Sequence, residues 1–244
     1  KDLVVALIDR GKYDFVGLQE ALRFQIDAIR EALPYFQEIG VGRDDGKQAG
    51  EYSAILYDGR RWRVVEQGTF WLSDEPNTPG SKTWGNRIPR IVTWGRFADV
   101  KSGRELYVFN THFDHQSQPS REKSAALLAE RLAHRDPVLP AVVTGDFNAA
   151  EDNPAIRLLK GETDRSPIRL VDTFRVLHPR AKEVGTFHGF NGGTAGGKID
   201  YVFVDAASNA KIVSAEILHD SHDGRYPSDH YPVMAEIEWP PTAE

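Results

Sequence analysis

Short apolar runs rich in β-branched and aromatic residues recur along this chain, and few helical patterns lie between them. The runs expected to form strands are residues 13–19, 51–58, 61–72, 90–100, 105–112, 139–147, 198–204, 210–218 and 232–239. The helical patterns cover residues 21–33, 119–135 and 153–160. So few helices among so many strands do not fit the regular alternation of a doubly wound parallel sheet. The pattern predicts an α+β fold with two sheets packed face to face and helices outside.

Composition narrows the classes of protein that this chain can form. Hydrophobic residues make up 40% of the 244 residues, enough for one sizeable core, so we expect one domain, with two small domains as the alternative. No apolar run approaches the roughly 18 residues that span a bilayer, and no signal peptide is visible. The absence of cysteine excludes disulfides, thiolate metal sites and a cysteine nucleophile. We expect a soluble monomer, with the bacterial cytoplasm, the periplasm and secretion all left open.

A glycine-rich stretch from Gly192 to Lys198 spells G-x-x-x-x-G-K, which is close to the phosphate-binding loop of nucleotide hydrolases. That motif needs a serine or threonine after the lysine and then a helix, but here Ile199 follows and a strand pattern begins. The stretch is therefore not a nucleotide cradle. We expect a mobile surface loop that leads into the strand carrying Asp200. Lys198 is expected to extend along the surface or reach a substrate phosphate, without being essential.

Polar residues with catalytic potential stand at the ends of several predicted strands. They are Glu20, His112, Asp146, Asn148, Asp200, Asp229 and His230. Singly, most such residues are turn, cap or surface residues, and His134, His178, His219 and His222 are interpreted in that way. Together they suggest a common site, because the ends of packed strands meet at one edge.

Each residue type in this set suits a particular chemical task. The carboxylates of Glu20 and Asp229 are hard oxygen ligands, suited to Mg²⁺, Mn²⁺ or Ca²⁺ rather than Zn²⁺. Asp146 can hold or deprotonate a water molecule, and Asn148 can donate to a phosphoryl oxygen. Asp200 can orient one ring nitrogen of His230 and leave the other nitrogen facing the substrate.

Five sequence blocks resemble the signatures of the endonuclease/exonuclease/phosphatase superfamily, which has the DNase I-like fold. They are "LQE" at 18–20, "NTHFDH" at 110–115, "GDFN" at 145–148, "KIDYVF" at 198–203 and "SDHYPV" at 228–233. Their order and spacing match over essentially the whole chain. Residues 40–76 further resemble a bacterial branch of mostly unassigned hydrolases. The resemblance implies a four-layer α/β/β/α sandwich of two packed mixed sheets flanked by helices.

The resemblance also implies a Mg²⁺-dependent hydrolase of phosphate esters and assigns roles to matching residues. Glu20 falls on the metal-ligand position and Asp229 on the second metal position. His112 falls on the phosphate and acid/base position, and Asp146 with Asn148 on the pair that activates water and orients the phosphate. Asp200 and His230 fall on the Asp–His dyad.

An arginine that contacts phosphate in some family members matches Arg90, although Arg87 and Arg96 compete for that position. One departure concerns the start of the chain. The family normally begins with a strand that ends in an asparagine supporting the metal-binding glutamate, whereas this sequence opens with the helical pattern "KDLVVALIDRG". We therefore expect a single domain over residues 1–244 that lacks the family's first strand.

The substrate is the open question at this stage. The net charge of −6 and the scattered arginines disfavour duplex DNA, because nucleases that track a duplex neutralise several phosphates. We expect two segments, 42–46 and 73–89, to wall off a pocket above the site; the second contains Trp84 and Arg87. Such a pocket would favour a small or head-group phosphate ester, and among these a diester. A metal-dependent nuclease is the alternative. A binding module without catalysis is more distant, because every block is intact.

Overall fold

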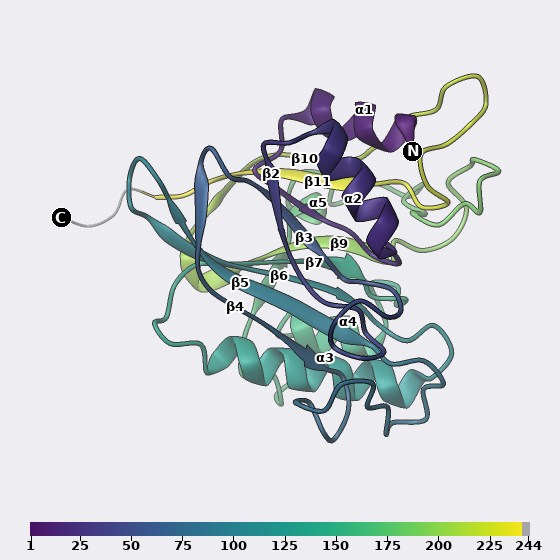
Figure 1. Ribbon diagram of the computed structural model, residues 1–244. Helices are drawn as coiled ribbons and strands as arrows, with labels where there is room; N and C mark the ends of the chain where they lie inside the picture. The colour runs from purple at the N-terminus through teal and green to yellow at the C-terminus, as the bar shows by residue number, and fades with distance from the viewer. Residues whose placement is uncertain (241–244) are drawn as a thin grey trace.

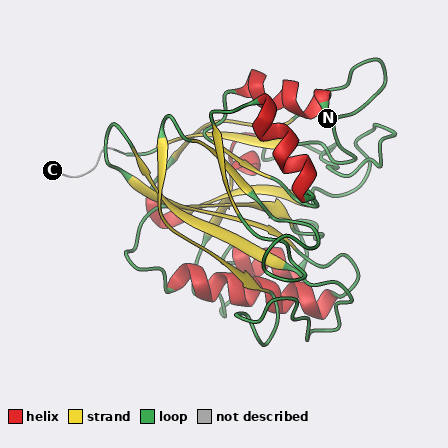
Figure 2. Cartoon of the chain, in the orientation of Figure 1, coloured by secondary structure: helices red, strands yellow, loops and turns green. Residues whose placement is uncertain are grey.

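The computed structural model describes residues 1–240, so the end of the predicted domain, 241–244, lies outside the described residues. The helices are α1 (Asp2–Gly11), α2 (Arg23–Ala32), α3 (Gln118–Ala133), α4 (Pro154–Leu159), α5 (Thr173–Leu177) and the 3₁₀ helix η1 (Ala206–Ser208). The strands are β1 (Phe15–Gly17), β2 (Phe36–Ile39), β3 (Ile55–Asp58), β4 (Trp62–Trp71), β5 (Ile91–Asp99), β6 (Glu105–His112), β7 (Ala141–Asp146), β8 (Leu170–Asp172), β9 (Asp200–Asp205), β10 (Lys211–Ile217) and β11 (Val233–Glu238). Figure 1 shows their arrangement and Figure 2 their types.

The largest sheet forms the centre of the molecule, with strand order β4-β5-β6-β7-β9-β8. It is mixed, because β6 and β7 run parallel while its other neighbouring strands run antiparallel. Helices α3 and α4 cover one face of this sheet (Figure 1). Successive side chains alternate between its faces, so Phe109 packs toward these helices while Val108 points to the other side.

Two smaller sheets cover the opposite face of the large sheet. The first, with order β1-β3-β2, packs on Phe97 and Val108, and the second, β10-β11, packs around Val204. Helices α1 and α2 lie on the outer side of the first small sheet, where Ile8 and Ile26 join its core. The four-layer α+β arrangement expected from the sequence is confirmed. The second β layer differs in detail from the expected single mixed sheet. Within residues 1–240 it consists of two antiparallel sheets, and no backbone pairing joins one to the other.

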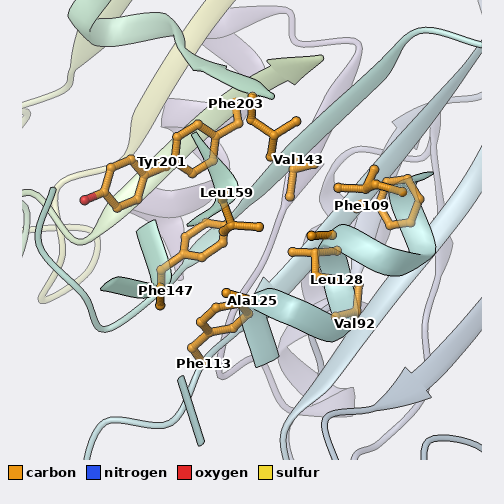
Figure 3. Packing of buried hydrophobic residues seen from close by; sticks show 14 of the residues in the cluster. Val92, Phe109, Phe113, Ala125, Leu128, Val143, Phe147, Leu159, Tyr201 and Phe203 are labelled. Carbon is orange, nitrogen blue, oxygen red and sulfur yellow. The ribbon is translucent and has the colours of Figure 1, made fainter. Parts of the chain in front are cut away.

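Buried aromatic rings fix the strand ends that carry the predicted site. Phe113 and Phe147 follow the last residues of β6 and β7, and their rings meet edge to face with centroids 4.8 Å apart (Figure 3). Phe147 also packs edge to face on Phe203 of β9 at 5.5 Å. These rings are fully buried, so they hold the chain on the helix side of the sheet and turn the preceding polar residues to the other side.

No helix within residues 1–240 has both the length and the apolar character needed to cross a membrane.

Candidate active site

Three predicted site residues lie side by side at one edge of the large sheet. Because β6 and β7 run parallel, their last residues, His112 and Asp146, are partners in the register. Strand β9 runs antiparallel to β7 and begins at this edge, which pairs Asp200 with Asp146. All three side chains are buried. The topology thus brings together groups that are distant in the sequence.

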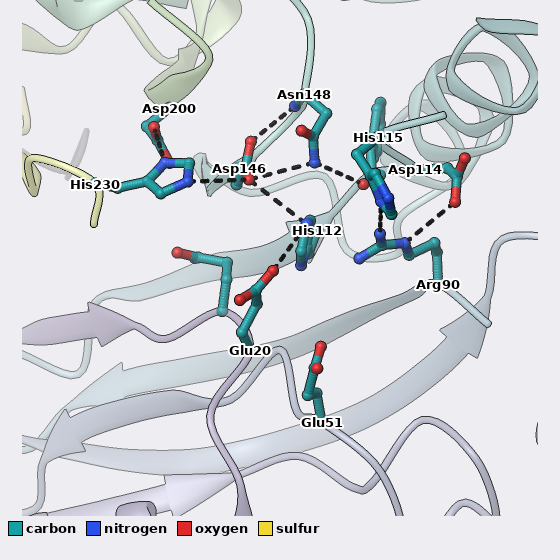
Figure 4. Close-up of polar contacts among 12 residues, drawn as sticks. Glu20, Glu51, Arg90, His112, Asp114, His115, Asp146, Asn148, Asp200 and His230 are labelled. Atoms are coloured by element: carbon teal, nitrogen blue, oxygen red, sulfur yellow. Dashed lines mark hydrogen bonds and ion pairs between the residues drawn. The ribbon is translucent and has the colours of Figure 1, made fainter. Parts of the chain in front are cut away.

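Asp200 and His230 form the expected dyad. The Nδ1 atom of His230 donates to Oδ2 of Asp200 at 2.8 Å, and Nε2 of the same ring lies 4.0 Å from Oδ2 of Asp146 (Figure 4). Burial acts to lower the pKa of His230, but the hydrogen bond and negative charge of Asp200 outweigh it and raise the pKa to about 9. The imidazole therefore carries a positive charge at neutral pH and turns Nε2–H toward Asp146.

Asp146 lies between the imidazole rings of His112 and His230. Its Oδ2 atom is 3.5 Å from Nε2 of His112, and its Oδ1 atom accepts the backbone N–H of Asn148 at 2.8 Å. Burial, followed by the charge of Asp200, raises the pKa of Asp146 to about 7. A carboxylate whose pKa lies near neutral pH is suited to take a proton from water.

Asn148 supports this arrangement through an unusual backbone conformation. Its φ of 46° is in the left-handed region, which asparagine tolerates better than most residues. Its Nδ2 atom donates to the carbonyl of Phe113 at 3.0 Å and more weakly to Asp146 at 3.3 Å. In this arrangement Asn148 joins the ends of β6 and β7. To donate to a substrate oxygen, its Nδ2 would have to give up the hydrogen bond to Phe113 or the one to Asp146.

A second group of ligand-type side chains faces His112 from the segments that follow β1 and precede β3 of the first small sheet. The donor atoms of Glu20, Glu51 and His112 all lie within 4.8 Å of one another, and Glu20 Oε1 is 3.8 Å from His112 Nε2 (Figure 4). Burial, followed by the positive charges of Arg90 and Arg43, lowers the pKa of His112 well below its usual value. His112 is therefore neutral, with one ring N–H to donate.

The chemistry of this group fits a hard divalent cation. Glu20 and Glu51 supply carboxylate oxygens, the donors that Mg²⁺, Mn²⁺ and Ca²⁺ prefer. The side chain of Glu20 is 63% exposed, and its φ of 60° places a non-glycine residue in a strained conformation that is common at functional sites. Asp146, Asp200 and His230 are also close enough to hold an ion. A protonated His230 ring cannot donate a lone pair to a metal ion, so this group is the poorer metal site. Glu20 and Glu51 fit a divalent cation better.

Asp229 is a member of neither of these two groups of ligand-type side chains among the described residues. Its carboxylate accepts from Ser228 Oγ at 3.3 Å, and its backbone carbonyl accepts from His188 N and Gly189 N at 2.9 and 3.0 Å. Its charge contributes to the raised pKa of His230 after those of Asp200 and Asp146. A metal-binding role for Asp229 stays a prediction.

Arg90 lies just before β5, beside the same site. Its Nη2 donates to Nδ1 of His115 at 2.8 Å, and its Nε is 3.5 Å from Oδ2 of Asp114 (Figure 4). The buried Nε and Nη1 atoms make no hydrogen bond to any described residue, which leaves donors for an anion. The competing Arg96 instead pairs with Glu105 at 2.9 Å.

The segments expected to wall the site meet each other. A Cβ placed on Gly46 would touch Pro79, and Trp71 Nε1 donates to the carbonyl of Arg43 at 2.7 Å. This contact holds Arg43 where its Nη1 lies 2.5 Å from Glu51. Trp84 was expected in the wall, but it is buried in the core and donates through Nε1 to Asp74 at 2.7 Å.

Lys198 differs most from its expectation. Its side chain is 1% exposed, with Nζ 2.8 Å from Oδ2 of Asp172 and 3.3 Å from the centre of the Tyr201 ring. The prediction of a surface lysine within reach of substrate is wrong, because the chain turns inward here to begin β9. Gly193 and Gly196, earlier in the loop, have positive φ and open space around them.

Glu51, Arg43 and His115 were missed as site residues. Glu51 opens the apolar run at 51–58, which alone looks like an ordinary strand start. Its position opposite His112 depends on how the first small sheet packs on the large one. The ending of the "NTHFDH" block was the only signal that pointed to His115.

Comparisons with known proteins agree with this fold. A structure from Bacteroides vulgatus described as an endonuclease/exonuclease/phosphatase is 33% identical, with a TM-score of 0.88, over 98% of this chain and 90% of that chain. The mannosyl-6-phosphatase of Bacteroides thetaiotaomicron VPI-5482 is also 33% identical, with a TM-score of 0.86, over 97% of this chain and 89% of that chain.

More distant proteins are also similar to this chain. The human Nocturnin catalytic domain is 16% identical with a TM-score of 0.75, over 98% of this chain and 85% of that chain, which shows the fold alone. The uncharacterized protein L388 of Acanthamoeba polyphaga mimivirus is 26% identical over 98% of this chain and 91% of its own length. The sequence profile of the Endonuclease/Exonuclease/phosphatase family matches residues 1–230, and the chain belongs to this family of phosphoester hydrolases.

Proposed function

We propose that this chain, as one domain over residues 1–244, is a divalent-metal-dependent phosphatase that acts on compact sugar phosphates. The observation that carries the proposal is the position of Asp146. Its Oδ2 atom lies 3.5 Å from Nε2 of His112 and 4.0 Å from Nε2 of His230. A base with a pKa of about 7 therefore stands beside one neutral and one charged imidazole.

In the proposed reaction, Asp146 accepts a proton from a water molecule whose oxygen attacks phosphorus in line with the leaving oxygen. The bond between phosphorus and the leaving oxygen breaks, and the released alcohol takes up a proton from solvent. The Nε2–H of His230, held by Asp200, donates to a phosphoryl oxygen as negative charge develops on it. His112 donates from the other side through its single N–H. Donors fixed in advance in this way typically contribute about 10²–10³ in rate each.

Two arginines provide the charge that a phosphate requires. Arg90 has free buried donors, and Arg43 is close enough for the two positive charges to lower the pKa of Arg90, after the larger effect of burial. An anion between these guanidinium groups would relieve that repulsion. We infer that they bind phosphoryl oxygens that His112 and His230 do not reach.

Glu20 and Glu51 are the residues that would hold the metal ion, with Mg²⁺ the first choice and Mn²⁺ or Ca²⁺ as alternatives. Asp229 is the remaining candidate for a more distant ligand. When bound, such an ion would neutralise negative charge on the substrate phosphate and its leaving oxygen.

The preference for a sugar monoester has two supports. The chain is 33% identical to a mannosyl-6-phosphatase over nearly its whole length. A terminal phosphate carries about −1.5 to −2 charge at neutral pH, and Arg43, Arg90 and charged His230 can balance it. The sequence alone favoured a diester. A diester would bring a single negative charge to Arg43, Arg90 and His230, which is less than these three groups can balance. A nuclease is the second candidate, because the chain also shares its fold with D. rerio TDP2, whose structure was solved in complex with a single-strand DNA product.

A substrate panel tests the proposal. Purified protein with Mg²⁺ should release phosphate from mannose 6-phosphate faster than it cleaves bis(p-nitrophenyl) phosphate or plasmid DNA, and EDTA should stop the reaction. Efficient plasmid cleavage with no phosphate release from sugar phosphates would replace this function by that of a nuclease.

A further inference from the structure

Two phenylalanine side chains project into solvent on the loop that precedes β9. Phe187 is 51% exposed and Phe190 is 59% exposed. Neither ring belongs to a hydrophobic cluster formed by the described residues. Folding therefore gains little from these two aromatic residues, and their placement calls for another explanation.

Backbone contacts fix Phe187 directly beside the catalytic dyad. Phe187 and His230 form an isolated β-bridge, and their rings lie 5.0 Å apart at 60°. The next backbone N–H groups, of His188 and Gly189, both donate to the carbonyl of Asp229. The exposed ring is thus held next to the imidazole that faces Asp146, within reach of the organic group of a bound phosphate ester.

Phe190 adopts a backbone conformation that bulky residues avoid. Its φ is +63°, in the left-handed region where the Cβ atom crowds the backbone. No core packing among the described residues compensates for this strain, since the side chain is exposed. Such outliers gather at ligand-binding sites, where the strained conformation presents a side chain to its ligand.

We propose that Phe187 and Phe190 form a platform that stacks on the sugar ring of the substrate. The inference rests on the proposed function and names the group that confers its specificity. The face of a phenyl ring carries the negative part of its quadrupole, which attracts the weakly positive C–H bonds of a pyranose. Polar neighbours suit the hydroxyl groups of a sugar: the exposed Asn191 side chain, whose Nδ2 bonds the Gly189 carbonyl at 3.0 Å, and the Asp229 carboxylate.

The test compares two monoesters that differ in the ring. Mannose 6-phosphate offers a pyranose to the platform, and glycerol 3-phosphate does not. We expect Phe187→Ala to lower kcat/KM for mannose 6-phosphate about tenfold, and that for glycerol 3-phosphate less than about twofold. Phe187→Trp keeps an aromatic face and should retain most of the activity. Val138→Ala is the control, because Val138 is exposed and precedes β7 at the end opposite Asp146.

Binding without turnover provides an independent measurement. In the Asp146→Asn background, saturation-transfer NMR should show enhanced ring C–H signals of mannose 6-phosphate, and adding Phe187→Ala should remove them. Thermal melting confirms that each variant is folded, as expected for an exposed side chain.

Failure of this inference can be distinguished from failure of the proposed function. If the unaltered protein hydrolyses neither monoester, the function fails. If it hydrolyses both and Phe187→Ala affects them equally or not at all, the platform is refuted while the function stands. If the unaltered protein prefers a 5′-nucleotide and Phe187→Ala removes that preference, the rings bind a base and the sugar platform is wrong.

Discussion

Replacing Asp200 by asparagine isolates what the dyad does. The change removes a negative charge 2.8 Å from Nδ1 of His230 and keeps the size of the side chain. The pKa of His230 is about 9 in the folded protein, against an ordinary value of about 6.5. This difference corresponds to about 3 kcal/mol in favour of the charged ring. We attribute most of it to Asp200, because its hydrogen bond and its negative charge are the largest effects that raise the pKa of His230.

The expected loss of activity follows from the population of charged His230. At pH 8, a pKa of 9 leaves about 90% of the ring charged, whereas a pKa of 6.5 leaves about 3%. If the charged ring is the active form, Asp200→Asn should lower kcat/KM at pH 8 by about 30-fold. A raised pKa means that the charged form is present below about pH 9 and is lost above it. The alkaline limb of the unaltered enzyme should therefore lie near pH 9, and that of the variant at about pH 6.5.

Two measurements test this expectation: the pH profile of kcat/KM for mannose 6-phosphate, and NMR titration of the His230 ring protons. Asp223→Asn is the matched control, since Asp223 lies 3.4 Å from His222 in an exposed pair away from the dyad. An unchanged His230 titration in Asp200→Asn, or an alkaline limb that does not move, would refute the assignment of the charged imidazole.

Three further predictions concern stability and metal binding. Lys198→Met leaves the buried Asp172 carboxylate without its cation and should lower the free energy of unfolding by about 3–5 kcal/mol in urea titrations; an unchanged midpoint would contradict the buried pair. Glu51→Gln, like Glu20→Gln, should weaken Mg²⁺ binding at least tenfold by calorimetry, and full affinity in both variants would move the metal site elsewhere. Phe147→Ala should cost about 3–5 kcal/mol, and a loss below about 1 kcal/mol would mean that this ring does not fix the end of β7.

The fold could be predicted from the sequence because its longer strands carry clear patterns. Strands such as β5 and β6 alternate between two packed faces, so their runs are long and apolar. The short strands β2 and β8, with four and three residues, were missed because so few residues show no period. The division of the second β layer depends on backbone pairing between distant segments, which no local pattern shows.

The site was predictable where its residues end strands and unpredictable where they reach it through tertiary packing. His112, Asp146 and Asp200 follow from the register of three neighbouring strands. Glu51 lies in the segment that leads into β3 of the first small sheet, and only the packing of that sheet on the large one brings it to His112. Lys198 was misjudged because a lysine after glycines looks solvent-exposed, whereas its ammonium group pairs with Asp172 inside the protein.

The proposed role of Asp146 is to activate water for attack on a phosphate monoester, and a comparison of turnover with and without its carboxylate can refute this role. Phosphate release from mannose 6-phosphate is followed with Mg²⁺ for the unaltered protein and for Asp146→Asn, with circular dichroism to confirm that both are folded. We expect steady release by the unaltered protein and a loss of about 10²–10⁴ in kcat for the variant. A folded Asp146→Asn protein with near-normal kcat would contradict it.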